Sequence, residues 1–314
     1  MTGFQRLCIA TTALVFVLIV LGGTVRATDS GLGCPDWPRC HGSFIPKWEK
    51  HTLIEYSHRL TASVVGVMVF AVAFWAWKSY RHTRSIFYPA AAILVLLLVQ
   101  GGLGGLTVIQ ELPPEIVTVH LATALTLFAL LCLVTVAAFA NEKPIGSARV
   151  PANLPGIALT ASALTFAVML IGAYVAGAGY SLACSGWPLC NGSVVPSMPA
   201  ESVQLVFFHR LFALALGLNL LALAFMAWRN RAVSGLVAKL SVAALMAYVL
   251  QALVGASNIW TDIADVAQIA HLAVGTALWG ILAYLDIRLF ALHQMLDKLP
   301  EKRSTPPGLA RAAR

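Results

Sequence analysis

The sequence is poor in charged residues. Asp, Glu, Lys and Arg together make up 11% of its 314 residues, whereas an ordinary globular domain carries about 25%. A soluble protein with so few charges could not cover its surface, and a hydrophobic fraction of 59% excludes intrinsic disorder. The net charge of +8 does not indicate nucleic-acid binding, because the positions of the basic residues along the chain explain it better.

Long stretches of the chain lack charged residues altogether. A transmembrane helix needs about 20 mostly apolar residues. The uncharged stretches are 7–25, 60–77, 85–110, 116–141, 150–200 (one span and a loop), 211–228, 240–261 and 266–285. We therefore predict an all-α membrane protein with eight transmembrane helices, the first of which is too long for the apolar core of a typical cleaved signal peptide.

The basic residues indicate the orientation of these helices. Most of the 21 lie near the N-terminus, after the second, fourth and sixth predicted helices, and in the C-terminal tail. Positive charge marks the cytoplasmic side of a membrane protein. We predict a plasma-membrane protein with both termini in the cytoplasm and two long loops, near 26–51 and 178–202, on the outer side.

The sequence also contains an internal repeat with an offset of 150 or 151 residues. Residues 34–43 recur as 184–193, and His58-Arg59-Leu60 recurs as His209-Arg210-Leu211. Further matches are Gln100 with Gln251 and 120–122 with 271–273. An even number of helices per copy inserts both copies in the same sense, so a pseudo-twofold axis along the membrane normal is expected. We predict two tandem four-helix bundles, residues 1–140 and 141–314.

Four histidines lie in the predicted helices, one in each even-numbered helix: His58, His120, His209 and His271. All lie one or two turns from the outer ends, so they share one layer near the outer face. A lone membrane histidine would most simply bridge helices, but four at repeated positions and equal depth indicate a function. Zinc fits poorly because each half lacks further ligands at that depth. Haem needs one or two axial imidazoles, which facing helices can supply.

Charged residues accompany the histidines. Arg59 and Arg210 follow the first histidine of each half. Two interpretations are open for them: pairing with haem propionates, and extension towards the membrane surface. Glu55 lies three residues before His58 on the same helix face, whereas Val206 occupies the matching position of the second half. A carboxylate beside a metal site can act as an acid, a base or a charge stabiliser, so we predict that the first half is catalytic and the second holds a cofactor. A plain interfacial glutamate is the alternative.

Each long loop carries a pair of cysteines, Cys34 with Cys40 and Cys184 with Cys190. In an oxidising outer compartment two disulfides are expected. A structural role is the prediction for the second pair. For the first pair a structural and a redox role both remain open, because its loop runs directly into Glu55 and His58.

Two segments of the sequence resemble a known protein family. Residues 22–38, followed by Glu55-Tyr56-Ser57-His58-Arg59, closely resemble the haem A synthases, and the resemblance covers both halves and all four histidines. It is closest in kind to the subgroup with cysteine pairs in both outer loops. The resemblance implies oxidation of the C8 methyl group of haem O to a formyl group through a hydroxymethyl intermediate, supplying haem A to haem–copper oxidases.

The same resemblance implies roles for individual residues. His58 and His120 would ligate the iron of the substrate haem, with the catalytic Glu55 beside them. His209 and His271 would be the axial ligands of haem b. Haem O synthase, an electron donor and membrane lipid are the expected partners, besides haem O itself, and nucleic acid is not expected.

Two other functions would use the same histidines. A di-haem membrane cytochrome would transfer electrons between quinol and a partner, and a haem carrier or assembly chaperone would only hold haem. Neither requires Glu55 or the difference between the two halves.

Overall fold

Eight α-helices make up most of the described part of the chain. The computed structural model describes residues 1–46, 48–139, 151–197, 200–232 and 234–297. The helices are α1 (Gly3–Ala27), α2 (Lys50–Tyr80), α3 (Arg84–Ile109), α4 (Pro114–Phe139), α5 (Leu154–Gly177), α6 (Glu201–Arg229), α7 (Gly235–Trp260) and α8 (Asp265–Asp297). Each is long and apolar enough to cross a membrane, which confirms the predicted all-α, multi-pass membrane protein.

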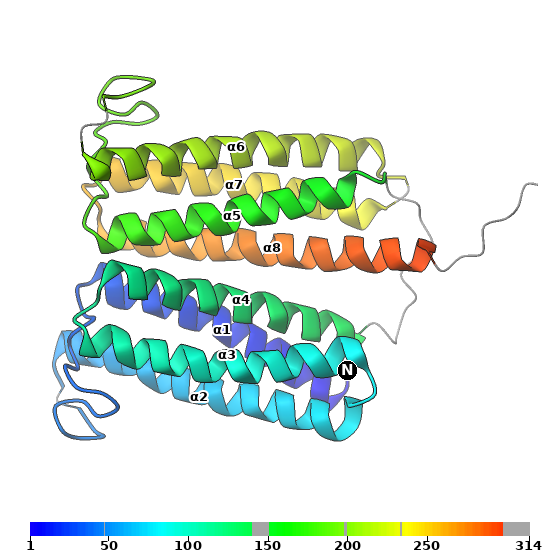
Figure 1. The fold of residues 1–314 in the computed structure, drawn as a ribbon, viewed down its shortest axis with the longest axis horizontal. Coiled ribbons are helices and arrows are strands. Elements are labelled where there is room, and N and C mark those ends of the chain that lie inside the picture. The colour runs from blue at the N-terminus through cyan, green and yellow to red at the C-terminus, as the bar shows by residue number, and fades with distance from the viewer. Residues whose placement is uncertain (47, 140–150, 198–199, 233, 298–314) are drawn as a thin grey trace, which may run out of the picture.

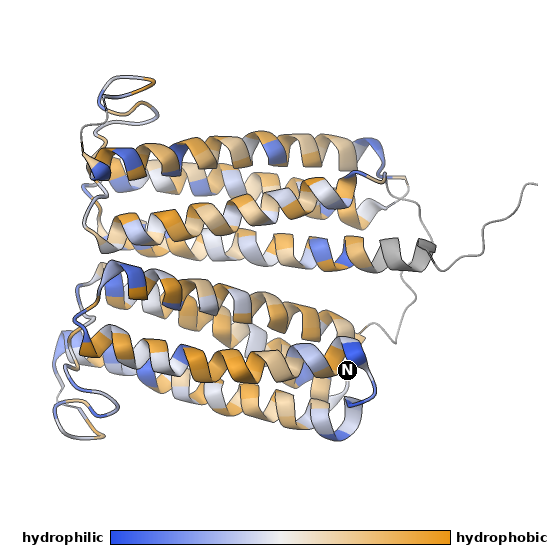
Figure 2. Ribbon diagram, viewed as in Figure 1, coloured by the Kyte–Doolittle hydropathy of each residue, from blue (hydrophilic) through white to orange (hydrophobic). Residues whose placement is uncertain are grey.

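The composition of the helices follows from the absence of water inside a bilayer. Backbone N–H and C=O groups have to pair within the protein there, which a continuous helix achieves. Apolar residues accordingly run along every helix, and hydrophilic residues gather near the helix ends (Figure 2). Local signals set some of these ends. Thr2 and Gln5 form a capping box at the start of α1, and Pro114 begins α4.

The helices form two groups of four. α1–α4 lie together and α5–α8 lie together, with the two long loops at one common end of the molecule (Figure 1). Between the groups, α4 packs against α5 and α8, and α1 packs against α8. The predicted boundary between 140 and 141 lies outside the described residues, as do Lys143, Arg149 and the basic tail. The division into halves 1–140 and 141–314 therefore stays a prediction.

Hydrogen bonds cross the interface between the two groups. The indole Nε1 of Trp279 in α8 donates to the carbonyl oxygen of Leu125 in α4 at 3.0 Å. Near the loops, Nη2 of Arg26 at the end of α1 donates to the carbonyl oxygen of Ala176 in α5 at 2.8 Å. Each group thus satisfies polar atoms of the other.

The internal repeat extends from the sequence to tertiary contacts. The hydroxyls of Thr12 and Thr135 hydrogen-bond between α1 and α4 at 2.9 Å, and the Ser162 hydroxyl donates to Asp286 between α5 and α8 at 2.6 Å. The ring pairs Phe16–Phe128 and Phe166–Trp279 correspond in the same way. A pseudo-twofold arrangement predicts such matches, although the axis itself stays a prediction.

The two long loops, 28–49 and 178–200, are built alike. Each contains a disulfide, Cys34–Cys40 in the first and Cys184–Cys190 in the second. We refer to them below as the first and second disulfide loops. After each disulfide the chain reverses through two residues with positive φ, His41-Gly42 and Asn191-Gly192, a conformation that favours Asn and Gly.

Short-range hydrogen bonds stabilise the first disulfide loop further. The Asp36 carboxylate accepts hydrogen bonds from the backbone N–H groups of Gly42 at 2.8 Å and His41 at 2.6 Å. These bonds favour the ionised carboxylate, so they hold the pKa of Asp36 below its usual range. The second disulfide loop uses Asn191 instead, whose Oδ1 accepts from the Ser185 N–H at 2.9 Å.

Cysteine labelling tests both disulfides. Alkylation of the denatured, unreduced protein should modify Cys8 and Cys132 alone, because these are the free cysteines of the described chain. Reduction before alkylation should add four labels, at the two disulfides. Mass spectrometry of the labelled protein counts them, and six labels without reductant would show that the loops are held by other contacts.

Candidate functional site

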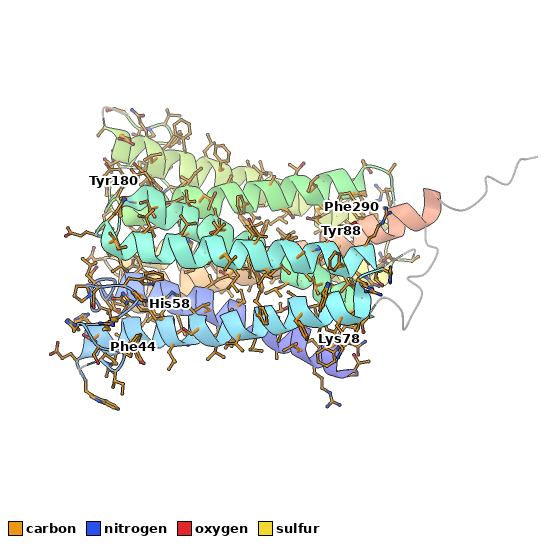
Figure 3. The ribbon with its side chains drawn as sticks, turned by 60° about the horizontal axis from the view of Figure 1, so that its bottom comes forward. Phe44, His58, Lys78, Tyr88, Tyr180 and Phe290 are labelled. Carbon is orange, nitrogen blue, oxygen red and sulfur yellow. A yellow bond between two sulfur atoms is a disulfide. The ribbon has the colours of Figure 1, made fainter. Side chains whose placement is uncertain are left out.

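The four histidines of the predicted haem sites lie at the end of the bundle that carries the disulfide loops. His58 and His209 are in α2 and α6, and His120 and His271 are in α4 and α8, each within the first three turns of its helix. Figure 3 shows His58 at the same end as Phe44 and Tyr180, far from Lys78 at the other end of α2. The four histidines, which the sequence predicts to lie in one layer, therefore all lie near the same end of the structure.

Each histidine ring packs against a glycine of the preceding helix. A Cβ atom built on Gly22 would lie 3.2 Å from Cε1 of His58, and one on Gly104 would lie 3.2 Å from Cε1 of His120. In the second group the distances are 2.9 Å, from Gly172 to His209 and from Gly255 to His271. A side chain in any of these places would push the ring away. The glycines follow the repeat offset, a signal that the sequence analysis did not use.

Each half of the chain contributes two of these histidines. His58 and His120 lie in the first group of four helices, and His209 and His271 lie in the second. Nδ1 of His209 lies 3.1 Å from the carbonyl oxygen of Val168 in α5. A bond from Nδ1–H to this oxygen leaves the Nε2 lone pair free for a metal, the arrangement that metal-ligating histidines usually adopt.

The remaining ring nitrogens are incompletely satisfied. Nδ1 of His58, His120 and His271 is buried without a hydrogen-bond partner in the described chain. Nε2 of His120 lies 3.2 Å from the side-chain amide nitrogen of Gln100, and Nε2 of His271 lies 3.4 Å from that of Gln251. Partly buried imidazoles, two in each half, are suited to hold a group between them, and a haem with axial imidazoles fits this donor set.

Glu55 has partners that the sequence analysis did not foresee. The side chain is 3% exposed, and its Oε2 accepts the backbone N–H of Cys34 at 2.8 Å. Its Oε1 accepts Nη2–H of Arg59 at 2.5 Å. The carboxylate therefore ties the start of the first disulfide loop to α2, one helical turn from His58.

Both arginines bind loop carbonyl groups. Arg59 donates to Cys34 at 2.7 Å and to Asp36 and Arg39 at 2.8 Å. Arg210 donates to Cys184 at 3.0 Å and to Leu189 at 2.8 Å. Extended side chains thus close the disulfide loops onto α2 and α6, a role that neither sequence-based interpretation included. Pairing with propionates stays a prediction.

The second half replaces the carboxylate anchor by apolar packing. Val206, at the position of Glu55, is 5% exposed and clusters with Val175 and the Cys184–Cys190 disulfide. The second disulfide loop is therefore held by Arg210 and by burial. The difference between the halves that the sequence indicates is therefore a difference in charge. The charged Glu55 contacts the first disulfide loop, whereas the apolar Val206 packs against the second.

Comparison with known proteins agrees with this architecture. Residues 5–52 and 47–283 match the family described as cytochrome oxidase assembly protein. A haem A synthase of Symbiobacterium thermophilum is 31% identical over 294 residues, and the match covers 91% of this chain and 95% of that protein. The chain belongs to the haem A synthase family. A haem A synthase of Exiguobacterium sp. is 31% identical, and the match covers 88% of this chain and 90% of that protein. A haem A synthase of Bacillus licheniformis is also 31% identical, and the match covers 92% of this chain and 97% of that protein.

Substitution of the glycines tests the packing at the histidines. Gly172→Ala places a methyl group against His209, and such overpacking typically lowers the free energy of unfolding by about 1–3 kcal/mol. Gly101→Ala is the matched control, because among the described residues no atom outside its own stretch of α3 lies within 4 Å of its Cβ position. Thermal unfolding in detergent should show a loss for Gly172→Ala and no loss for Gly101→Ala. Equal melting temperatures would show that the His209 ring moves aside freely.

Proposed function

We propose that this protein is a haem A synthase, which oxidises the C8 methyl group of haem O to a formyl group through a hydroxymethyl intermediate. The observation that carries the proposal is the presence of two partly buried histidine pairs, each packed on glycines, in a chain that matches haem A synthases over nine-tenths of its length. The curated relatives do not favour a di-haem electron-transfer cytochrome.

The two pairs would serve different haems. We assign His209 and His271 to haem b and His58 and His120 to the substrate haem. The contact of His209 with the Val168 carbonyl supports a ligand role for His209, because it favours the tautomer in which Nε2 is free. Glu55, present beside the first pair alone, supports chemistry in the first half. When bound, haem iron supplies the redox chemistry that oxidation of a methyl group requires.

The protein's own contribution would be positioning and charge. Both oxygens of Glu55 accept hydrogen bonds from N–H donors, so the geometry favours a fixed carboxylate over a group that gives up a proton. Such a carboxylate would stabilise positive charge that develops on the attacked carbon. Arg59 holds it in place and is itself held by the first disulfide loop.

The proposed location is the plasma membrane, with the disulfide loops outside. Basic side chains at the opposite end of the helices support this orientation, because positive charge favours the cytoplasmic side. They include Lys78, Arg81, Arg84, Arg229 and Arg231. The helices expose apolar side chains to lipid, an environment that suits a substrate with a farnesyl tail.

Incubation with haem O tests the function directly. The purified protein in detergent or vesicles, supplied with haem O, a reductant and oxygen, should yield hydroxymethyl and formyl haems on pigment extraction. A protein that binds haem and returns haem O unchanged would be an electron-transfer cytochrome or a carrier.

Removal of the second histidine pair tests the haem b assignment. His209→Ala and His271→Ala should each lose most of the tightly held haem b, because each removes one axial bond. The haem content per protein and the reduced-minus-oxidised spectrum measure this loss. Wild-type spectra in both variants would show that haem b is held elsewhere.

Glu55→Gln tests the role of the carboxylate. The substitution keeps the shape and removes the charge, so haem b should stay while conversion of haem O falls by about 100- to 1,000-fold, the usual effect of losing one preorganised electrostatic group. Glu49→Gln is the control, since Glu49 is an exposed glutamate at the start of α2. Full haem A yield from Glu55→Gln would leave Glu55 as a loop anchor alone.

A further inference from the structure

The two halves differ in how a glutamine is held against the second histidine of each pair. In the first half, the amide nitrogen of Gln100 in α3 lies 3.2 Å from Nε2 of His120 and 3.1 Å from the His120 carbonyl oxygen. The amide oxygen of Gln100 accepts a hydrogen bond from the hydroxyl of Thr123, three residues further along α4. Gln100 is thus fixed by contacts at both ends of its amide group.

These contacts determine the orientation of the amide and the tautomer of the imidazole. The atom that faces the His120 carbonyl oxygen has to be the NH₂ group, since two oxygens would repel each other. An amide NH₂ group only donates, so Nε2 of His120 has to accept, and the ring proton lies on Nδ1. This tautomer is also the one that a metal at Nε2 requires. Gln100 therefore prepares His120 for ligation and at the same time occupies its lone pair.

The second half lacks this restraint. Val274 stands at the position of Thr123 and offers no hydroxyl group. The amide nitrogen of Gln251 lies 3.4 Å from Nε2 of His271, while its amide oxygen Oε1 is buried without a hydrogen-bond partner in the described chain. Gly275 lies beside Gln251, with its Cβ position 3.1 Å from the amide nitrogen. Gln251 can leave His271 without breaking a second bond.

We propose that Gln100, held by Thr123, is a positioning residue that makes His120 a displaceable axial ligand, whereas the unrestrained Gln251 leaves His271 a permanent one. The inference rests on the proposed function. It gives a physical reason why the first-half haem would be released and the second-half haem retained. A substrate site has to release its product and leave one coordination position open, and competition from the Gln100 amide for Nε2 provides both. A cofactor site has to retain its haem.

Carbon monoxide binding to the reduced protein tests this inference, because the gas binds haem iron only where an axial ligand is absent or yields. The protein is purified with haem b and loaded with haem O. In the wild type the first-half haem should bind carbon monoxide and the second-half haem should not. Thr123→Val frees Gln100 while keeping the side-chain shape, so His120 should stay on the iron. Carbon monoxide affinity of the first-half haem should then fall by about 10-fold, the equivalent of one hydrogen bond.

Matched variants provide the controls. Thr123→Ser keeps the hydroxyl and should behave as the wild type, whereas Gln100→Leu should behave as Thr123→Val. The reciprocal Val274→Thr supplies a hydroxyl to the unpaired Gln251 oxygen and should make the second-half haem reactive towards carbon monoxide. Transfer of haem O to apomyoglobin should slow in Thr123→Val by a similar factor, which gives a readout independent of catalysis.

The outcomes separate this inference from the proposed function. If the wild type converts haem O to haem A while Thr123→Val and Gln100→Leu leave carbon monoxide affinity and haem release unchanged, the glutamine restraint is overturned and the synthase stands. If the wild type forms no haem A, the proposed function fails whatever the carbon monoxide result. If Thr123→Val does not fold, Gln100→Leu and Val274→Thr decide the question.

Discussion

A polar atom inside a bilayer has no water to bind, so it needs a partner within the protein or a ligand that completes it. This constraint accounts for the eight continuous helices and for the small number of polar side chains between them. Where two helices carry polar groups, they meet in pairs such as Thr12–Thr135 and Ser162–Asp286. Exceptions remain in the described chain, among them the Nδ1 atoms of three of the four histidines near the disulfide loops.

The duplicated architecture separates a shared framework from local differences. Both halves place a histidine ring on a glycine, close a disulfide loop with an arginine, and set a glutamine beside the second histidine. Two differences lie next to these elements, Glu55 against Val206 and Thr123 against Val274. Two copies of one unit can thus differ beside each histidine pair without any change of fold.

Much of this could be predicted from the sequence. The helices follow from uncharged stretches of sufficient length, and the cysteine and histidine pairs follow from the repeat. The path of the first disulfide loop across α2 could not be predicted from the sequence. Helical spacing places Glu55 and Arg59 on a face near His58, but only the folded chain shows the Cys34 backbone lying across that face. The Gln100–Thr123 contact could not be predicted either, because it joins α3 and α4, whose relative rotation is set by packing.

The hydrogen bond from Trp279 to the Leu125 carbonyl has a consequence for the history of such a protein. In an isolated four-helix copy the indole N–H would face hydrocarbon without an acceptor, and the ends of α1 and α5 would lose the Arg26–Ala176 contact. Each copy has thus become part of the other's interior. A single four-helix unit would have to pair with a second molecule of itself or cover this surface differently, and fusion into one chain would make such an association permanent.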